Sequence, residues 1–290
     1  MKLQNWQGMR MLEPFLKWAG GKRWLISNFH SIFPQNYNRY VEPFLGSGAV
    51  YFSLNPSQAV LSDINSELID TFQALKTDWK SVYELLMKHH NKHTEAYYYK
   101  VRASNPENLY ACAARFIYLN RTCWNGLYRV NLKGQFNVPI GTKTKVIMES
   151  DSFDEVSERL KNADLFKGDF ESIIDNTVNG DFLFVDPPYT VNHSDNGFIK
   201  YNEKLFSWDD QVRLSRCLIR AKIRRVQIVL TNAPHESIYS LYSRKFKCIT
   251  LSRSSIIAAD SAKRKKCDEL IITNVNLKGA LKNYSANYGL

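Results

Sequence analysis

The sequence predicts an α/β protein with a doubly wound, mainly parallel sheet and a second, smaller lobe. Four short apolar segments, each ending at a turn or a polar residue, are typical of buried parallel strands: Tyr40–Phe44, Ala59–Ser62, Asp181–Val185 and Gln227–Leu230. A helical pattern from about Ala49 joins the first two, as in a strand–helix–strand unit. Ligands of such sheets bind beyond the carboxyl ends of the strands, so the polar residues there are expected to form one pocket.

A region of different character, residues 76–150, interrupts this pattern. It is rich in helical patterns and in aromatic and basic residues, and it contains no Asp or Glu from Asn108 to Met148. We therefore expect a catalytic domain formed by residues 1–75 and 151–290, and a separate lobe formed by residues 76–150.

The charge balance points to a polyanionic partner. The chain has 39 Lys and Arg against 28 Asp and Glu, a net charge of +11, which favours nucleic acid but also fits a generally basic soluble protein. No apolar run reaches the ~20 residues of a bilayer span, and Met1–Arg10 lacks a signal-peptide core, so we expect a cytoplasmic protein with no membrane partner. The five scattered cysteines predict neither disulfides nor zinc, and we expect no metal.

Three stretches carry residue types that suit a nucleoside. In Glu42–Gly48, a turn of small residues lets a ligand approach the backbone. Asp63 ends the next strand, where a carboxylate can accept both hydroxyls of a ribose; the alternative is a helix cap for the segment from Asn65. Phe15–Lys22 adds a glycine pair, an aromatic and two lysines, but it is not a phosphate loop and could be a simple helix start. A nucleoside without a pyrophosphate fits better than a dinucleotide.

The most specific motif is Asp186-Pro187-Pro188-Tyr189, directly after a predicted strand. Two prolines fix a rigid turn. An exocyclic amine on a base is a poor nucleophile, because its lone pair is delocalised into the ring. Hydrogen bonds from its N–H groups to the Asp186 carboxylate and the Pro187 carbonyl would favour a tetrahedral nitrogen that can attack a sulfonium methyl group. Tyr189 could stack on the base, which must then leave the duplex. A strand that merely breaks at two prolines is the alternative.

These motifs, and their order, resemble the Dam family of N6-adenine DNA methyltransferases. The resemblance runs from about Phe15 to Thr273. It rests on Lys17–Lys22, Glu42–Gly48, Asp63–Asn65, Asn120–Gly141 and Asp186–Tyr189, and on the late segments Arg264–Lys266 and Asp268–Leu270. It implies a Rossmann-like S-adenosylmethionine-dependent methyltransferase core, an inserted and mainly helical target-recognition lobe, duplex DNA as partner, and base flipping.

The resemblance also implies roles for individual residues. The catalytic residues are Asp186, Pro187 and Tyr189. The expected contacts to S-adenosylmethionine are Trp18, Lys22, Phe44, Gly46, Asp63, Asp169, Phe170 and Asp186. The expected contacts to DNA are Lys17, Arg121, Trp124, Asn125, Leu127, Arg129 and Pro139.

The segment Trp124–Arg129 resembles the family's β-hairpin that enters the DNA. The Asn-Gly pair beside Trp124 suits a turn, and Trp124 could fill the space left by the flipped base. The alternative is a core tryptophan, with Arg129 touching only phosphate. If Arg129 reads guanine in the major groove, and Leu127 and Pro139 meet a thymine methyl group, the family resemblance narrows the target to GATC, modified on both strands.

Other functions remain open at this point. The same turn could serve N4-cytosine methylation, and a catalytically silent DNA-binding regulator would keep the basic lobe. Methyltransferases that form methylglutamine carry Asn where Asp186 stands. A cognate restriction endonuclease is a candidate partner, and a monomer suffices to methylate one strand per encounter.

Overall fold

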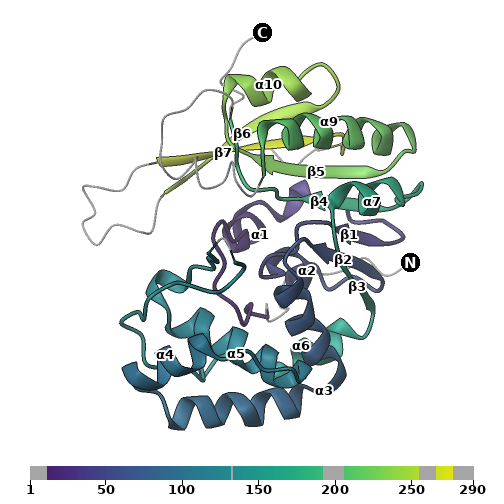
Figure 1. The fold of residues 1–290 in the computed structure, drawn as a ribbon. Coiled ribbons are helices and arrows are strands. Elements are labelled where there is room, and N and C mark those ends of the chain that lie inside the picture. The colour runs from purple at the N-terminus through teal and green to yellow at the C-terminus, as the bar shows by residue number, and fades with distance from the viewer. Residues whose placement is uncertain (1–11, 132, 192–205, 255–265, 277–290) are drawn as a thin grey trace. The chain divides into compact units, whose positions relative to one another are not determined.

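The computed structural model describes residues 12–131, 133–191, 206–254 and 266–276, which form two compact units (Figure 1). One unit comprises the described parts of Met1–Asn28 and Leu45–Gly168, and the other the described parts of Phe29–Phe44 and Asp169–Leu290. The expectation for Met1–Arg10, and Arg264 and Lys265 of the late segment of the family resemblance, lie outside the described residues.

The first unit contains a parallel strand pair preceded by a short helix. β2 (Ala59–Asp63) pairs with β3 (Ala163–Lys167), with Asp63 opposite Lys167 at the carboxyl ends. α2 (Ala49–Leu54) begins after Gly48, whose φ of 68° is left-handed, a conformation that glycine adopts without a steric cost. The predicted helix from Ala49 and the predicted strand that follows it are thus both confirmed.

Helices make up most of the rest of this unit, and the next four lie together in the lower part of Figure 1. α3 (Ser66–Asn91) packs along α5 (Leu109–Thr122), with α4 (Glu95–Ala103) and α6 (Phe153–Leu160) beside them. α1 (Arg23–Phe29) starts near the glycine pair.

The long helix α3 is broken at Asp78, which has φ −153° and ψ 84°. Its carboxylate accepts hydrogen bonds from the backbone N–H and the hydroxyl of Ser81, as a cap does at the start of a new helix. This break lies just beyond residue 76, where the inserted lobe is predicted to begin. The chain therefore changes direction at this predicted boundary by a break within a helix, without a loop.

The second unit holds the remaining described strands, in the spatial order β1-β4-β5-β7-β6. β1 (Tyr40–Glu42), β4 (Phe182–Val185) and β5 (Gln227–Asn232) are parallel, whereas β7 (Lys266–Thr273) runs antiparallel to β5 and to β6 (Lys247–Ser254). All four residues of β4 are buried, as expected of a central parallel strand. The predicted first strand ends two residues early because Pro43 cannot donate to a ladder.

The helices of the second unit include α7 (Phe170–Asp175), α9 (Trp208–Ile223) and α10 (Glu236–Tyr242), together with the 3-10 helix η1 (His30–Ile32). α7 packs against α9, and α9 packs against β5 (Figure 1). The strands and helices of the two units confirm the predicted mixed α/β class with a mainly parallel sheet.

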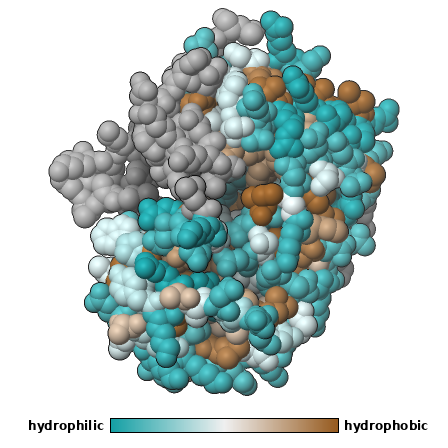
Figure 2. Space-filling view, in the orientation of Figure 1, coloured by the Kyte–Doolittle hydropathy of each residue, from teal (hydrophilic) through white to brown (hydrophobic). Residues whose placement is uncertain are grey.

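The visible surface is mostly hydrophilic, with small and separate hydrophobic patches (Figure 2). The described helices include none that is both long and apolar enough to cross a membrane.

Candidate active site

The glycine turn after β1 lies against Trp18. Gly46 has φ +50°, and a Cβ atom added there would lie 2.8 Å from Cδ1 of Trp18. The Trp18 ring also stacks on Tyr128 at 5.9 Å and on Phe116 at 6.4 Å between centroids. Glycine is therefore favoured at position 46 for two reasons: its backbone conformation is left-handed, and the indole ring of Trp18 leaves no room for a Cβ atom.

Asp63 ties the end of β2 to this turn. Its Oδ2 accepts from the Gly46 N–H at 3.0 Å, and its Oδ1 accepts from the Asn65 N–H at 3.0 Å. Burial raises the pKa of the Asp63 carboxyl, whereas the backbone N–H groups of Asn65, Gly46 and Ile64 act to lower it. Each carboxylate oxygen can accept more than one hydrogen bond, so ribose hydroxyls could bind in addition.

Asp63 is not the helix cap that was the alternative reading of its position. Asn65 is the N-cap of α3, because its side-chain oxygen accepts from the Leu68 N–H at 3.1 Å. The helix-cap alternative for Asp63 is therefore wrong.

Lys22 lies where the glycine pair leads into α1. The residue is 4% exposed, and its ammonium group donates to the Gly20 carbonyl at 2.7 Å. This hydrogen bond helps to hold the conformation of the glycine pair. A contact between Lys22 and a ligand stays a prediction.

The Asp186–Tyr189 turn follows β4 in the second unit. Asp186 and Tyr189 are half-buried, and Pro187 is buried. Thr231, on β5, donates its hydroxyl to Asp186 Oδ1 at 2.6 Å, and the Tyr189 hydroxyl donates to Glu269 on β7. Burial, and next the charges of Asp186 and Glu269, raise the pKa of Tyr189 well above its ordinary value, so this hydroxyl keeps its proton and acts as a donor.

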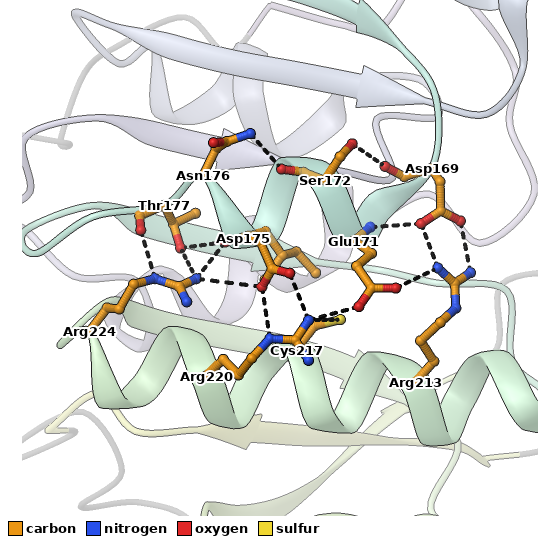
Figure 3. Close-up of polar contacts among 11 residues, drawn as sticks. Asp169, Glu171, Ser172, Asp175, Asn176, Thr177, Arg213, Cys217, Arg220 and Arg224 are labelled. Carbon is orange, nitrogen blue, oxygen red and sulfur yellow. Dashed lines mark hydrogen bonds and ion pairs between the residues drawn. The ribbon is translucent and has the colours of Figure 1, made fainter.

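Asp169 and Phe170 stand at the start of α7. Asp169 is its N-cap, accepting from the Glu171 N–H at 2.9 Å, and both its oxygens are held by Arg213 of α9, at 2.6 and 2.7 Å (Figure 3). These hydrogen bonds from Arg213 lower the pKa of Asp169. Phe170 is 4% exposed, stacks on Phe44 at 5.3 Å and lies 4.2 Å from the Arg213 guanidinium carbon. The half-buried Phe44 ring thus offers more surface to a ligand than Phe170 does.

Sequence reasoning missed Arg213 and its neighbour Arg220. Arg220 binds Asp175 and Glu171, so two arginines clamp α7 along one face of α9 (Figure 3). Their seven-residue spacing, two helical turns, was the available signal. It indicates a shared helix face but does not identify the acidic partners.

The predicted hairpin exists, but its reversal is not at the Asn-Gly pair. Trp124–Gly126 forms the 3-10 turn η2, in which Asn125 has φ 55°. The chain turns back further on, where the Asn131 N–H donates to the Gln135 carbonyl at 2.8 Å, and the two arms meet at the Cys123–Ile140 and Val130–Phe136 bridges. Asn131 stabilises this turn by accepting from two backbone N–H groups, those of Lys133 and Gln135.

The start of this hairpin exposes apolar side chains. Trp124 is 51% exposed and Leu127 42% exposed, so the core-tryptophan alternative is wrong. Asn125, Pro139 and Arg129 are exposed as well, and the Arg129 Nε donates to Asn137 Oδ1 at 2.8 Å across the hairpin. Large exposed apolar groups beside a basic side chain suit a nucleic-acid surface.

Arg121 requires a correction. The residue is 1% exposed, and its guanidinium binds both oxygens of Asp151 at 2.6 Å as well as the Phe15 and Val146 carbonyls. The guanidinium N–H groups thus donate to partners inside the protein. Arg121 therefore has a structural role and does not make the expected DNA contact. Sequence shows its charge but not the buried partner.

Lys17 is half-buried and joined to the hairpin by Asn120. The Asn120 amide accepts from the Lys17 N–H at 2.8 Å and donates to the Lys17 carbonyl at 2.8 Å and to the Gly126 carbonyl at 3.3 Å. Burial, and next the charge of Lys143, lower the pKa of Lys17. The Trp18 segment and the hairpin are thereby fixed to each other. The prediction that the Gly46 turn, Asp63 and Asp186 share one pocket stays a prediction.

Comparison with known proteins identifies the class. Residues 18–256 match the family described as D12 class N6 adenine-specific DNA methyltransferase, and the chain belongs to this family. The predicted fold class, the adenine-specific methyltransferase activity and the resemblance to Dam proteins are confirmed, and the cytosine and silent-regulator alternatives are set aside. The family implies S-adenosylmethionine as methyl donor and DNA as substrate.

Individual relatives cover nearly the whole chain. The Type II methyltransferase M1.LlaDCHI of Lactococcus lactis subsp. cremoris is 36% identical over 272 residues, 91% of this chain and 95% of the relative. The Type II methyltransferase M.MjaIII of Methanocaldococcus jannaschii is 34% identical over 287 residues, 91% and 99% of the two chains. The DNA adenine methylase of Escherichia coli K12 is 29% identical over 268 residues, 91% and 95%.

Gly46→Ala is expected to weaken binding of S-adenosylmethionine, because the new methyl group displaces Trp18. Gly134→Ala is the matched control, since Gly134 also has a positive φ, +74°, but a Cβ there meets nothing within 4 Å. Both variants should lose about 1 to 2 kcal/mol of unfolding free energy from backbone strain. Only Gly46→Ala should lose donor affinity in calorimetry, and equal affinity in the two variants would contradict the assignment.

Proposed function

We propose that this enzyme transfers a methyl group to N6 of adenine within GATC in duplex DNA, on both strands, after flipping the base out of the helix. The observation that carries the proposal is the Asp186–Tyr189 turn, which presents a carboxylate, a proline carbonyl and an aromatic ring after β4, with Asp186 held by Thr231 and Tyr189 by Glu269.

Within the turn, Asp186 and the Pro187 carbonyl accept hydrogen bonds from the two N–H groups of the target amine. This favours a tetrahedral nitrogen whose lone pair points away from the ring and toward the methyl donor. The Tyr189 ring stacks on the base and holds it in the plane that these acceptors require. S-adenosylmethionine supplies an electrophilic methyl group on a sulfonium centre.

The donor fits the residues of the glycine turn. Gly46 leaves room that a Cβ would fill, Trp18 borders it, and the Asp63 carboxylate lies beside it with capacity for ribose hydroxyls. We assign contacts with the adenine of the donor to Phe44, Asp169 and Phe170. Lys22 is assigned the role of holding the glycine pair in shape.

The hairpin is assigned the DNA. Trp124 is large and exposed enough to fill the space left by a flipped base, and Leu127 and Pro139 offer apolar surface to a thymine methyl group. Arg129 is assigned the hydrogen bonds to guanine, while Lys17 and Asn125 contact the sugar-phosphate backbone of the DNA beside it. The Type II names of two relatives make a cognate restriction endonuclease a candidate partner, and we propose that a monomer acts on each strand in turn.

Asp186→Ala is expected to lower turnover by several orders of magnitude, because the target amine loses its carboxylate acceptor. DNA binding and the folded state should persist, since the side chain is half-buried at the end of β4. Single-turnover methylation rates and DNA affinity measured on the same preparation test this. A rate near that of the parent enzyme would remove Asp186 from the active site.

Asp63→Ala should weaken donor binding by about 1 to 3 kcal/mol, the range of lost hydrogen bonds to a charged group. Asn65→Ala is the control, because it removes the true helix cap beside Asp63 and should cost about 1 kcal/mol of stability with little loss of donor affinity. Calorimetry on both variants separates the two roles. If the donor affinity of Asp63→Ala equals that of the parent, the Asp63 carboxylate binds only the backbone and not the donor.

Arg129→Ala should relax specificity at one base pair of the target by about 1 to 3 kcal/mol. Methylation rates on GATC and on each single-base variant, for parent and mutant, provide the measurement. A uniform loss on all substrates, with a reduced salt slope, would make Arg129 a phosphate contact. Sequencing of the modified bases in treated DNA identifies the target directly, and a parent enzyme indifferent to GATC would overturn that assignment.

A further inference from the structure

The catalytic turn receives contacts from two neighbouring strands of the second unit. β5 and β7 pair in antiparallel register, with Thr231 opposite Ile271 and Asn232 opposite Leu270. Thr231 and Glu269 lie at the same end of this pair, beside the place where β4 leads into Asp186. Neither residue belongs to the turn. Thr231 directly follows a predicted strand and Glu269 lies in the Asp268–Leu270 segment of the family resemblance, but the sequence assigned a role to neither.

Thr231 fixes the Asp186 carboxylate. It is fully buried, and its hydroxyl lies 2.6 Å from Asp186 Oδ1 and 3.4 Å from the Val185 carbonyl. A hydroxyl has one proton to donate, so the shorter, charge-assisted bond to the carboxylate takes it. A bond to one oxygen restricts rotation of the carboxylate plane and thereby sets the direction in which the other oxygen points.

Glu269 fixes the ring of Tyr189. It is 5% exposed on β7 and accepts the hydrogen bond of the Tyr189 hydroxyl. Because the hydroxyl sits at the far end of the ring from the backbone, this bond and the rigid prolines hold the ring at both ends. The plane available for stacking is then set before a base arrives.

We propose that Thr231 and Glu269 are positioning residues for methyl transfer, which orient the Asp186 carboxylate and the Tyr189 ring through these two hydrogen bonds. The inference rests on the proposed catalytic role of the turn. Neither residue is a catalytic residue: Thr231 is 0% and Glu269 5% exposed, so both act through the residues of the turn. Their loss should affect the chemical step far more than the binding of donor or DNA.

The test for Thr231 uses a pair of variants and a matched control. Thr231→Val keeps the shape of the side chain and removes the hydroxyl, whereas Thr231→Ser keeps the hydroxyl. Thr273→Val is the control, since Thr273 is equally buried on β7, and its hydroxyl donates at 2.6 Å to the Ile228 carbonyl, not to the catalytic turn. Single-turnover rates, and Kd values for S-adenosylmethionine and a GATC duplex, are measured for each.

Thr231→Val should lower the single-turnover rate about tenfold to hundredfold, the range of a lost hydrogen bond to a charged group. Both Kd values should stay within about twofold of the parent. Thr231→Ser should restore most of the rate, and Thr273→Val should retain it despite a similar loss of thermal stability. Equal rates in the two valine variants, or no rescue by serine, would overturn the role of Thr231.

The second arm addresses Glu269 and does not require Thr231→Val to fold. Glu269→Gln keeps an acceptor for the Tyr189 hydroxyl and should retain more activity than Glu269→Leu, which removes it. In a Tyr189→Phe background, where the hydroxyl is absent, Glu269→Leu and Glu269→Gln should have the same rate. A difference between them that persists in that background would show that Glu269 acts by another route and overturn its assignment.

Asp186→Ala, measured alongside, separates this inference from the proposed function. If Asp186→Ala is inactive and Thr231→Val is as fast as Thr273→Val, the catalytic turn stands and the positioning role of Thr231 fails. If Asp186→Ala methylates at the parent rate, the catalytic assignment itself fails, and the positioning roles fail with it.

Discussion

Carboxylates that follow strands must find hydrogen-bond partners, and this constraint shapes the functional parts of both units. A half-buried carboxylate is costly unless donors surround it. Asp63 after β2 is held by the backbone N–H groups of Gly46 and Asn65. Asp169 after β3 is held by Arg213, and Asp186 after β4 by the Thr231 hydroxyl. Each partner is of a different chemical kind, but the consequence is the same: the carboxylate has a fixed direction before any ligand binds.

The partners differ in how they respond to substitution. A backbone N–H group is lost only when proline replaces the residue, so the Asp63 turn depends mainly on residues that allow the backbone this conformation, above all Gly46. The Arg213 contact to Asp169 is part of a cluster of ion pairs, because Arg213 and Arg220 both also bind Glu171, so Asp169 is held by more than one bond. The Thr231 contact depends on a single hydroxyl, which makes it the most sensitive of the three.

Sequence predicted what local chemistry determines. Parallel strands are apolar runs with abrupt polar ends, so the strands, the helix from Ala49 and the motif-bearing turns could be read directly. The hairpin was misplaced because Asn125-Gly126 is a strong turn signal, yet the reversal depends on the Asn131 side chain, which accepts two backbone N–H groups of its own turn. Arg121 was misassigned because charge in a basic segment indicates a polyanion, and only the fold reveals that Asp151, thirty residues away, neutralises it. Arg213 lies outside every motif, Thr231 was seen only as the residue after a strand, and Glu269 only as part of the Asp268–Leu270 resemblance. Sequence reasoning assigned a role to none of them, since a supporting contact requires only a donor or an acceptor at the right place on a neighbouring element.

Burial separates the two tasks of this methyltransferase. The groups proposed to orient the chemistry are buried or half-buried and hydrogen-bonded inside their unit, with Thr231 and Glu269 at 0% and 5% exposure. The groups assigned to DNA are exposed, with Trp124 at 51% and Leu127 at 42%, and they stand on a hairpin that few ladder hydrogen bonds stabilise. Asn120 joins that hairpin to Lys17 and, through the chain, to Trp18 beside the glycine turn. If the hairpin binds DNA as proposed, it has to adapt to the shape of the duplex, whereas transfer to a weakly nucleophilic amine requires acceptors that do not move. Placing the hydroxyl and the carboxylate that support those acceptors on paired strands of a sheet meets the second requirement without stiffening the hairpin.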